Sequence, residues 1–183
     1  MRATALALGV LLSSAGTAEA AGMDEMNQVV SRFYAAYSTF HPSDGIPDAA
    51  ARAKYEPFIS PALDALLRQS DAAEMKFHAA HKDSPPLLEG DLFTSNFEGA
   101  TSYRLGTCSG GGTSARCAVL LTYDPGGAGN PRDKPITWTD TVDLVDTPAG
   151  WRVDDIAYGG NWDFGNKGKL TETLRAAISV ASP

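Results

Sequence analysis

The stretch ITWTDTVDLVDTPAGWRVDDIAYG, residues 136–159, contains two runs of alternating side chains separated by a turn. Side chains of a strand point alternately to the two faces of its sheet, so this period of two predicts two strands, each with one packed face. TPAG between the runs is typical of a tight turn, and together they predict an antiparallel hairpin. In the first strand the packed face consists of Trp138, Asp140, Val142 and Leu144.

A second hairpin is predicted upstream. TSYRLGTC, residues 101–108, and RCAVLLTYD, residues 116–124, have the same period and flank a glycine-rich segment. Glycine-rich segments between such runs favour turns. The two hairpins together predict a mostly antiparallel sheet of about four strands.

The chain before Gly99 has a helical period instead. Asp24 is a predicted N-cap, and Ala49 to Tyr55 is a predicted short helix. Ser60 and Pro61 supply a hydroxyl cap and a first-turn proline for a further helix that ends near His81. The first helix has one apolar stripe, formed by Met26, Val29, Val30, Phe33, Tyr34 and Tyr37.

A final helix carries Leu170, Leu174, Ala177 and Ile178 on one stripe. Helices followed by a run of antiparallel strands define the α+β class. We therefore expect N-terminal helices packed on a curved sheet, with a C-terminal helix and a concave side where a pocket can form.

The first twenty residues have the pattern of a secretory signal peptide. Arg2 is followed by an apolar run from Ala3 to Leu12 and by an A-x-A cleavage site at residues 18–20. The apolar run is too short to span a membrane, and no cysteine follows the cleavage site to carry a lipid. The sequence predicts residues 1–20 as a signal peptide and 21–183 as a single domain, periplasmic or secreted and without a membrane span.

The charge of the chain argues against one class of partner. The formal net charge is −7, with no basic stripe interleaved with aromatic residues, so we expect no nucleic-acid binding. No G-x-S-x-G elbow and no phosphate-binding glycine loop occur. The sequence predicts no cofactor.

Cys108 and Cys117 are the two cysteines of the chain. In an exported protein, an even pair that flanks a turn is most simply a disulfide. A zinc pair or a redox dithiol is the alternative, but there is no C-x-x-C motif and no histidine nearby.

Two aspartates raise the question of catalysis. If Trp151 and Val153 face the core, parity places Asp155 inward and Asp154 outward. Asp155 and Asp140 are then weak candidates for an acid and base pair across the hairpin, since neighbouring carboxylates raise one pKa. Alternatively, backbone amides, threonines or Tyr158 satisfy these acids structurally, or a bulge turns the pair to solvent.

Glu74, His78 and His81 share a helix face and are weak candidates for metal ligands. The spacing differs from the H-E-x-x-H motif of metalloproteases. A solvated helix end with a favourable histidine charge explains the same residues, so no metal is predicted.

Two aromatic segments are candidates for binding. EGDLFTSNFEG, residues 89–99, is either a lid whose aromatics line a pocket, with polar contacts from Asp91, Ser95 and Glu98, or a loop fixed to the core by its phenylalanines. In GGNWDFGNKGK, residues 159–169, Trp162 and Phe164 either face a partner or close one end of the sheet. The candidate ligand-binding residues are Phe93, Phe97, Trp138, Asp155, Tyr158 and Trp162.

Three short motifs resemble an uncharacterised family of bacterial exported proteins and lipoproteins. They are SPAL at 60–63, GDLFTS at 90–95 and WRVDDIAYGG at 151–160. The helix-then-sheet order is similar to the cystatin-like or NTF2-like fold. The resemblance implies that fold for roughly residues 26–180 and brings no established activity or catalytic residue.

We therefore expect a non-catalytic binding or accessory protein that uses the concave face of its sheet for a small molecule or another periplasmic protein. One alternative is a small hydrolase or isomerase that uses Asp140 and Asp155. Another is an inhibitor or immunity-like interaction protein, which requires an exposed aromatic patch around Trp162.

Overall fold

The computed structural model describes residues 15–39, 45–128 and 134–181. Within these ranges the chain forms four α-helices and one antiparallel sheet of four strands, which confirms the α+β class. The elements are α1 (Ala15–Thr39), α2 (Ala49–Tyr55), α3 (Pro61–Ala80), β1 (Ser102–Gly111), β2 (Ser114–Tyr123), the short 3₁₀ helix η1 (Pro125–Ala128), β3 (Ile136–Thr147), β4 (Gly150–Ala157) and α4 (Leu170–Val180).

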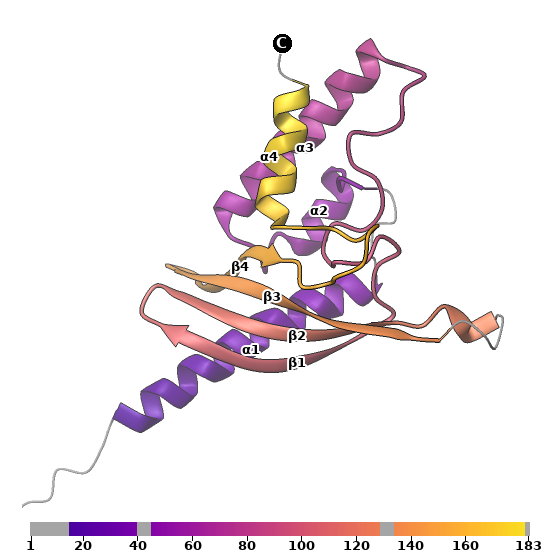
Figure 1. The fold of residues 1–183 in the computed structure, drawn as a ribbon. Coiled ribbons are helices and arrows are strands. Elements are labelled where there is room, and N and C mark those ends of the chain that lie inside the picture. The colour runs from indigo at the N-terminus through magenta and orange to yellow at the C-terminus, as the bar shows by residue number, and fades with distance from the viewer. Residues whose placement is uncertain (1–14, 40–44, 129–133, 182–183) are drawn as a thin grey trace, which may run out of the picture.

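The strands follow one another in space as they do in the chain, in the order β1-β2-β3-β4 (Figure 1). Helix α1 crosses one face of the sheet, which we call the inner face, and α3 and α4 lie side by side beyond β4. Ile59 pairs with Val153, and Lys169 pairs with Ala157, so both segments extend the sheet at its β4 edge. The opposite side of the sheet is called the outer face.

Helix α1 buries the predicted apolar stripe against the inner face, and Phe33 and Tyr34 are fully enclosed there. The predicted N-cap is wrong, because α1 begins at Ala15 and Asp24 is an exposed residue inside the helix. Residues 15–22 read AGTAEAAG, and alanine is the strongest helix former, so the helix continues in the N-terminal direction. No helix in the described ranges is long and apolar enough to cross a membrane.

The starts of α2 and α3 follow the chemistry of their caps. Asp48 Oδ1 accepts a hydrogen bond from the amide of Ala51 at 2.8 Å. Ser60 Oγ accepts one from the amide of Leu63 at 2.9 Å, and Pro61 occupies the first helical position. These bonds satisfy amides that have no partner within the helix, and they confirm the predicted start at Ser60. The predicted end is also confirmed, since α3 ends at Ala80.

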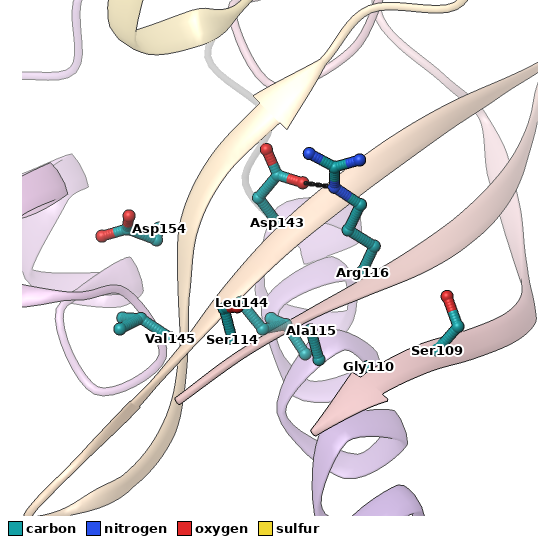
Figure 2. Close-up of a pocket in the computed structure, with 9 residues that line it drawn as sticks. All are labelled: Ser109, Gly110, Ser114, Ala115, Arg116, Asp143, Leu144, Val145 and Asp154. Carbon is teal, nitrogen blue, oxygen red and sulfur yellow. Dashed lines mark hydrogen bonds and ion pairs between the residues drawn. The ribbon is translucent and has the colours of Figure 1, made fainter. Parts of the chain in front are cut away.

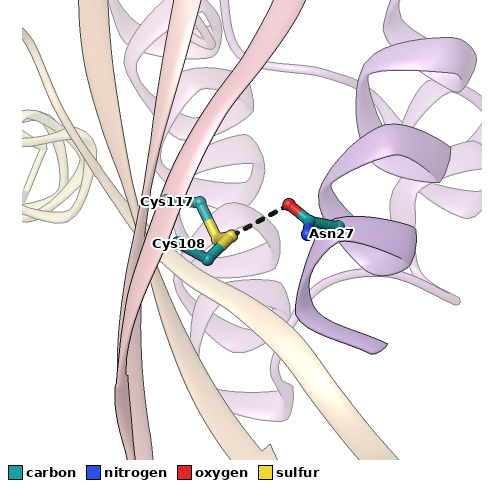
Figure 3. Close-up of a disulfide and its surroundings, with 3 residues drawn as sticks. All are labelled: Asn27, Cys108 and Cys117. Atoms are coloured by element: carbon teal, nitrogen blue, oxygen red, sulfur yellow. Dashed lines mark hydrogen bonds between the residues drawn. A yellow bond between two sulfur atoms is a disulfide. The ribbon is translucent and has the colours of Figure 1, made fainter. Parts of the chain in front are cut away.

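Cys108 and Cys117 form the predicted disulfide. They lie directly opposite each other on β1 and β2, and both are buried on the inner face. Cys108 Sγ lies 3.3 Å from the side-chain oxygen Oδ1 of Asn27 on α1 (Figure 3). The crosslink therefore fixes the first hairpin beneath the helix that covers it.

Removal of the disulfide is expected to lower the free energy of unfolding by roughly 2–3 kcal/mol, because the unfolded chain regains the entropy of a short loop. The change is Cys108→Ala with Cys117→Ala, and urea unfolding measures the difference. The wild-type protein in a reducing agent is the matched sample and should unfold at a similarly reduced urea concentration. A double variant as stable as the oxidised protein would contradict this expectation.

A β-bulge in β4 overturns the parity argument for Asp155. Val153 pairs with Leu144 and Asp155 pairs with Asp143, so Asp154 is an extra residue on β4. Partners across an antiparallel pair lie on the same face, which places Asp155 beside Asp143 on the outer face. Ile156 takes the inner position instead and is fully buried there. The prediction that Asp155 points inward beside Asp140 is therefore wrong.

Candidate functional site

Most of the residues predicted to bind a ligand gather where two loops meet the start of β3. The first loop, residues 91–99, is fixed to the core, because Leu92 and Phe93 are both buried. The ring of Phe93 packs against Tyr55 with centroids 4.6 Å apart. The hydroxyl of Tyr158 donates a 2.7 Å hydrogen bond to the Leu92 carbonyl. Of the two alternatives for this segment, the fixed loop describes residues 91–96.

Asp140 holds both loops to the sheet. Its Oδ2 accepts from the amide of Ser95 at 2.8 Å and from Trp138 Nε1 at 3.0 Å. Its Oδ1 accepts from the amide of Gly159 at 2.8 Å and from the Ser95 hydroxyl. Asp140 is completely buried, and hydrogen bonds to a buried carboxyl group are among the stronger ones in proteins. We call residues 91–99 and 159–166, together with Asp140, the loop junction.

The second loop has little room at its first residue. A side chain at Gly159 would place a Cβ only 1.9 Å from the carbonyl oxygen of Thr139, so only glycine fits between β3 and this loop. Further along, Asn166 Nδ2 donates 2.7 Å hydrogen bonds to the carbonyls of Asp91 and Thr94. The two loops therefore behave as one packed unit, which the sequence pattern did not indicate.

Asp91 is a buried acid at the base of the first loop. Its Oδ1 accepts from the amides of Phe93 and Thr94 at 2.7 and 2.9 Å. Burial raises the pKa of Asp91 from 3.8 to about 7, although hydrogen bonds from the Tyr37 hydroxyl and from these amides oppose the shift. The sequence named Asp91 only as a polar contact of the lid alternative, because the local pattern does not show that the carboxyl group itself is buried.

The loop junction presents aromatic rings to solvent. Trp162 is half-buried and packs edge-to-face on Trp138, with centroids 5.3 Å apart, so it closes this end of the sheet. The amide of Gly165 bonds to the Trp162 carbonyl at 3.3 Å, and this turn projects Phe164, which is 90% exposed. Phe97 on the first loop is 44% exposed.

Asp155 has a structural position on the outer face. Its Oδ1 accepts from the amide of Thr171 at 3.0 Å, and its Oδ2 accepts from the Thr171 hydroxyl at 2.8 Å. Thr171 lies in the first turn of α4, where amides lack partners within the helix. Asp155 thus caps α4 from a neighbouring strand, and Lys169 Nζ lies 3.8 Å from it.

The two candidate catalytic acids do not share a site. Asp140 lies on the inner face with Ser95 and Gly159, whereas Asp155 lies on the outer face with Thr171. An acid and base pair needs both groups within reach of one substrate.

The predicted metal candidates make contacts with other groups. His78 Nε2 lies 2.8 Å from Glu74 Oε1, and Glu74 Oε2 accepts from the amide of Leu87. The ring of His81 stacks on Phe77, with centroids 4.7 Å apart. Among the described residues, no group of three or more histidine, cysteine, aspartate or glutamate side chains is placed to hold a metal ion.

An open depression of about 460 Å³ lies on the outer face near the β1–β2 hairpin (Figure 2). Arg116 and Asp143 line it as an ion pair with Nε and Oδ1 3.0 Å apart. Asp154 lines it too, and its Oδ1 accepts a 2.5 Å hydrogen bond from Ser60. The charged groups of this depression are therefore engaged with other residues of the protein.

Comparison with protein-family models and with curated proteins finds no match to this chain.

Proposed function

We propose that this protein is a non-catalytic binding or accessory module that contacts a protein partner through the loop junction. The observation that carries the proposal is Phe164, an aromatic ring 90% exposed on a turn that is tied to the core. Large aromatic side chains dominate the binding energy of protein interfaces, and a turn whose backbone is already held in place loses little backbone entropy when it binds.

The inner face of the sheet is a weaker candidate for the binding surface. Helix α1 covers it, and its central residues Val119, Val142 and Val153 are fully buried. The hydrolase or isomerase alternative is also weakened, because Asp140 and Asp155 belong to separate hydrogen-bond networks. The loop junction is therefore the better candidate for the binding surface than the concave side of the sheet.

The charges around the exposed rings favour a basic partner. Glu98 follows Phe97, Asp163 precedes Phe164, and both acids are exposed. In the described part of the chain neither acid forms an ion pair. Of the nearby lysines, Lys169 pairs with Asp143 outside the loop junction, whereas Lys167 donates to the Gly160 carbonyl within it and offsets one of the two acids. A partner with an apolar hollow bordered by lysine or arginine is complementary to this surface.

Phe164→Ala is expected to weaken partner binding by roughly tenfold or more while the stability of the fold stays unchanged. Peptides selected by phage display against the wild-type protein serve as the probe, and they should carry an apolar anchor beside basic residues. Met75→Ala removes a comparably exposed apolar side chain on α3 and is the matched control. Selected peptides that bind wild type and Phe164→Ala equally would rule out the loop junction as the binding surface.

We also propose that the protein acts outside the cytoplasm, with the cystatin-like or NTF2-like fold of the bacterial exported proteins that its motifs resemble. The Cys108–Cys117 disulfide supports export, because structural disulfides persist in oxidising compartments. The helix-covered antiparallel sheet is compatible with that fold. A mature protein whose mass lacks residues 1–20 is the expected result of export.

A further inference from the structure

Two neighbouring depressions lie between α1, the segment 56–61 and the turn from β3 to β4. Their volumes are about 410 and 240 Å³. Ala149 and Arg152 line both depressions, so they form one surface feature, which we call the arginine groove. It lies away from the loop junction, and none of the functions discussed above uses it.

The larger depression combines an apolar floor with basic groups. Val29 of α1 and Trp151 of β4 line it and are 7% and 8% exposed, and the half-buried Phe58 lines it as well. Arg32 and Arg152 line it from α1 and β4. The lining is mainly polar, with a smaller apolar part, and its volume is in the usual range of sites for small molecules.

The two arginines are available for a ligand. In the described part of the chain neither Arg32 nor Arg152 forms an ion pair. Arg152 Nη1 donates a 2.8 Å hydrogen bond to the Trp151 carbonyl, which orients its guanidinium group. Its remaining N–H groups can still bind an acceptor, because a guanidinium carries five donors in a fixed fork.

The charge of this depression is opposite to that of the protein. The chain has a formal net charge of −7, yet two arginines and a single glutamate, Glu25, line this hollow. In the smaller depression Arg68 is paired with Asp64, and Glu56 adds a carboxylate, so the excess of positive charge is confined to the larger depression. The free positive charge of the groove is thus concentrated at Arg32 and Arg152.

We propose that the arginine groove binds a small organic anion, with its carboxylate held by Arg32 and Arg152 and its apolar body resting on Trp151 and Phe58. Guanidinium groups match the two oxygens of a carboxylate, and such charge-assisted bonds are stronger than neutral ones. The ligand class is an aromatic or short aliphatic carboxylate, since a larger lipid would exceed the volume of the groove.

The probe for this proposal is 2-naphthoate, with the neutral 2-naphthamide as its isostere. Calorimetry measures affinity, and the NMR signal of the Trp151 indole N–H reports the location. Naphthoate should bind saturably and shift the Trp151 signal, and naphthamide should bind roughly tenfold more weakly. Arg32→Gln and Arg152→Gln should each weaken naphthoate binding roughly tenfold, and added salt should weaken it further.

Arg104→Gln is the matched control, because Arg104 is an exposed arginine on β1 that lies outside the groove. This variant should bind naphthoate as wild type does. Thermal unfolding verifies that the variants are folded, and Arg32 is exposed, so its loss leaves the core intact. Equal affinity for naphthoate and naphthamide, unchanged affinity in both groove variants, or no saturable binding would each overturn the proposal. None of these outcomes bears on binding at Phe164.

Discussion

Asp140→Ala is expected to destabilise this protein by about 4 kcal/mol. Its carboxyl group accepts hydrogen bonds from the amides of Ser95 and Gly159, from the Ser95 hydroxyl and from the Trp138 indole. Alanine would leave these donors buried without an acceptor, and each such group costs roughly 1–3 kcal/mol before the structure relaxes. The loss of these hydrogen bonds should detach both loops of the loop junction from the sheet.

Urea unfolding, followed by tryptophan fluorescence, measures this effect, because Trp138 and Trp162 pack together beside Asp140. Asp163→Ala is the control, since it removes an exposed acid from the neighbouring loop and should change the free energy of unfolding by less than about 0.5 kcal/mol. Equal unfolding curves for the two variants would show that Asp140 does not hold the loops.

The second large effect is a dependence of stability on pH that comes from Asp91. The folded protein raises the pKa of Asp91 from 3.8 to about 7, so the folded state binds this proton more tightly than the unfolded state does. The contribution of Asp91 to the free energy of unfolding is therefore fully present below about pH 4 and is lost as the pH rises through 7. The shift corresponds to roughly 4 kcal/mol at most.

Asp91→Asn removes the titration and keeps an oxygen that can accept from the amides of Phe93 and Thr94. The measurement is the free energy of unfolding of both proteins at several values between pH 4 and pH 8. The variant should gain stability relative to wild type as the pH rises from 4 to 8, most steeply around the folded-state pKa of about 7. Asp163→Asn should show no such trend relative to wild type. A difference between Asp91→Asn and wild type that stays constant with pH would contradict the raised pKa.

Helices and hairpins could be predicted because their signals are local. The apolar stripe of α1 and the Ser60 cap each depend on residues within a few positions of one another. The same holds for the hairpin strands, whose alternating pattern on β3 matches the buried positions Trp138, Asp140, Val142 and Leu144. Local chemistry was sufficient for these elements.

The position of Asp155 could not be predicted because a bulge leaves no clear trace in the alternation. WRVDDIA contains apolar residues on both sides of the two acids, so the sequence is compatible with either Asp154 or Asp155 facing inward. The register of β4 against β3 decides on which face each acid lies. In that register the hydroxyls of Ser60 and Thr171, which belong to other segments of the chain, donate hydrogen bonds to Asp154 and Asp155. The alternation of inward and outward side chains on β4 continues only as far as the bulge, and beyond it the two faces are exchanged.

The loop junction was predicted only in part. Phe93, Trp138, Tyr158 and Trp162 were selected for their residue type, and the structure places each of them in the loop junction or in contact with it. Their roles depend on contacts between segments far apart in sequence, such as the bonds from Asn166 to Asp91 and Thr94. The sequence left open whether residues 89–99 form a lid over a pocket or a loop fixed to the core, and the fold buries residues 91–96 as the second alternative predicted.

The meander order of the sheet also determines the sequence of events when the chain folds. Each hairpin joins contiguous residues, so the loops that must close to form it are short and cost little entropy. Helix α1 belongs to the beginning of the chain, yet it packs on β4 near the end, and it can dock only when the hairpins exist. The first hairpin can cover part of the apolar stripe of α1, but the part that packs on β4 remains uncovered until β4 is complete. That interval is when the nascent chain is most prone to aggregate.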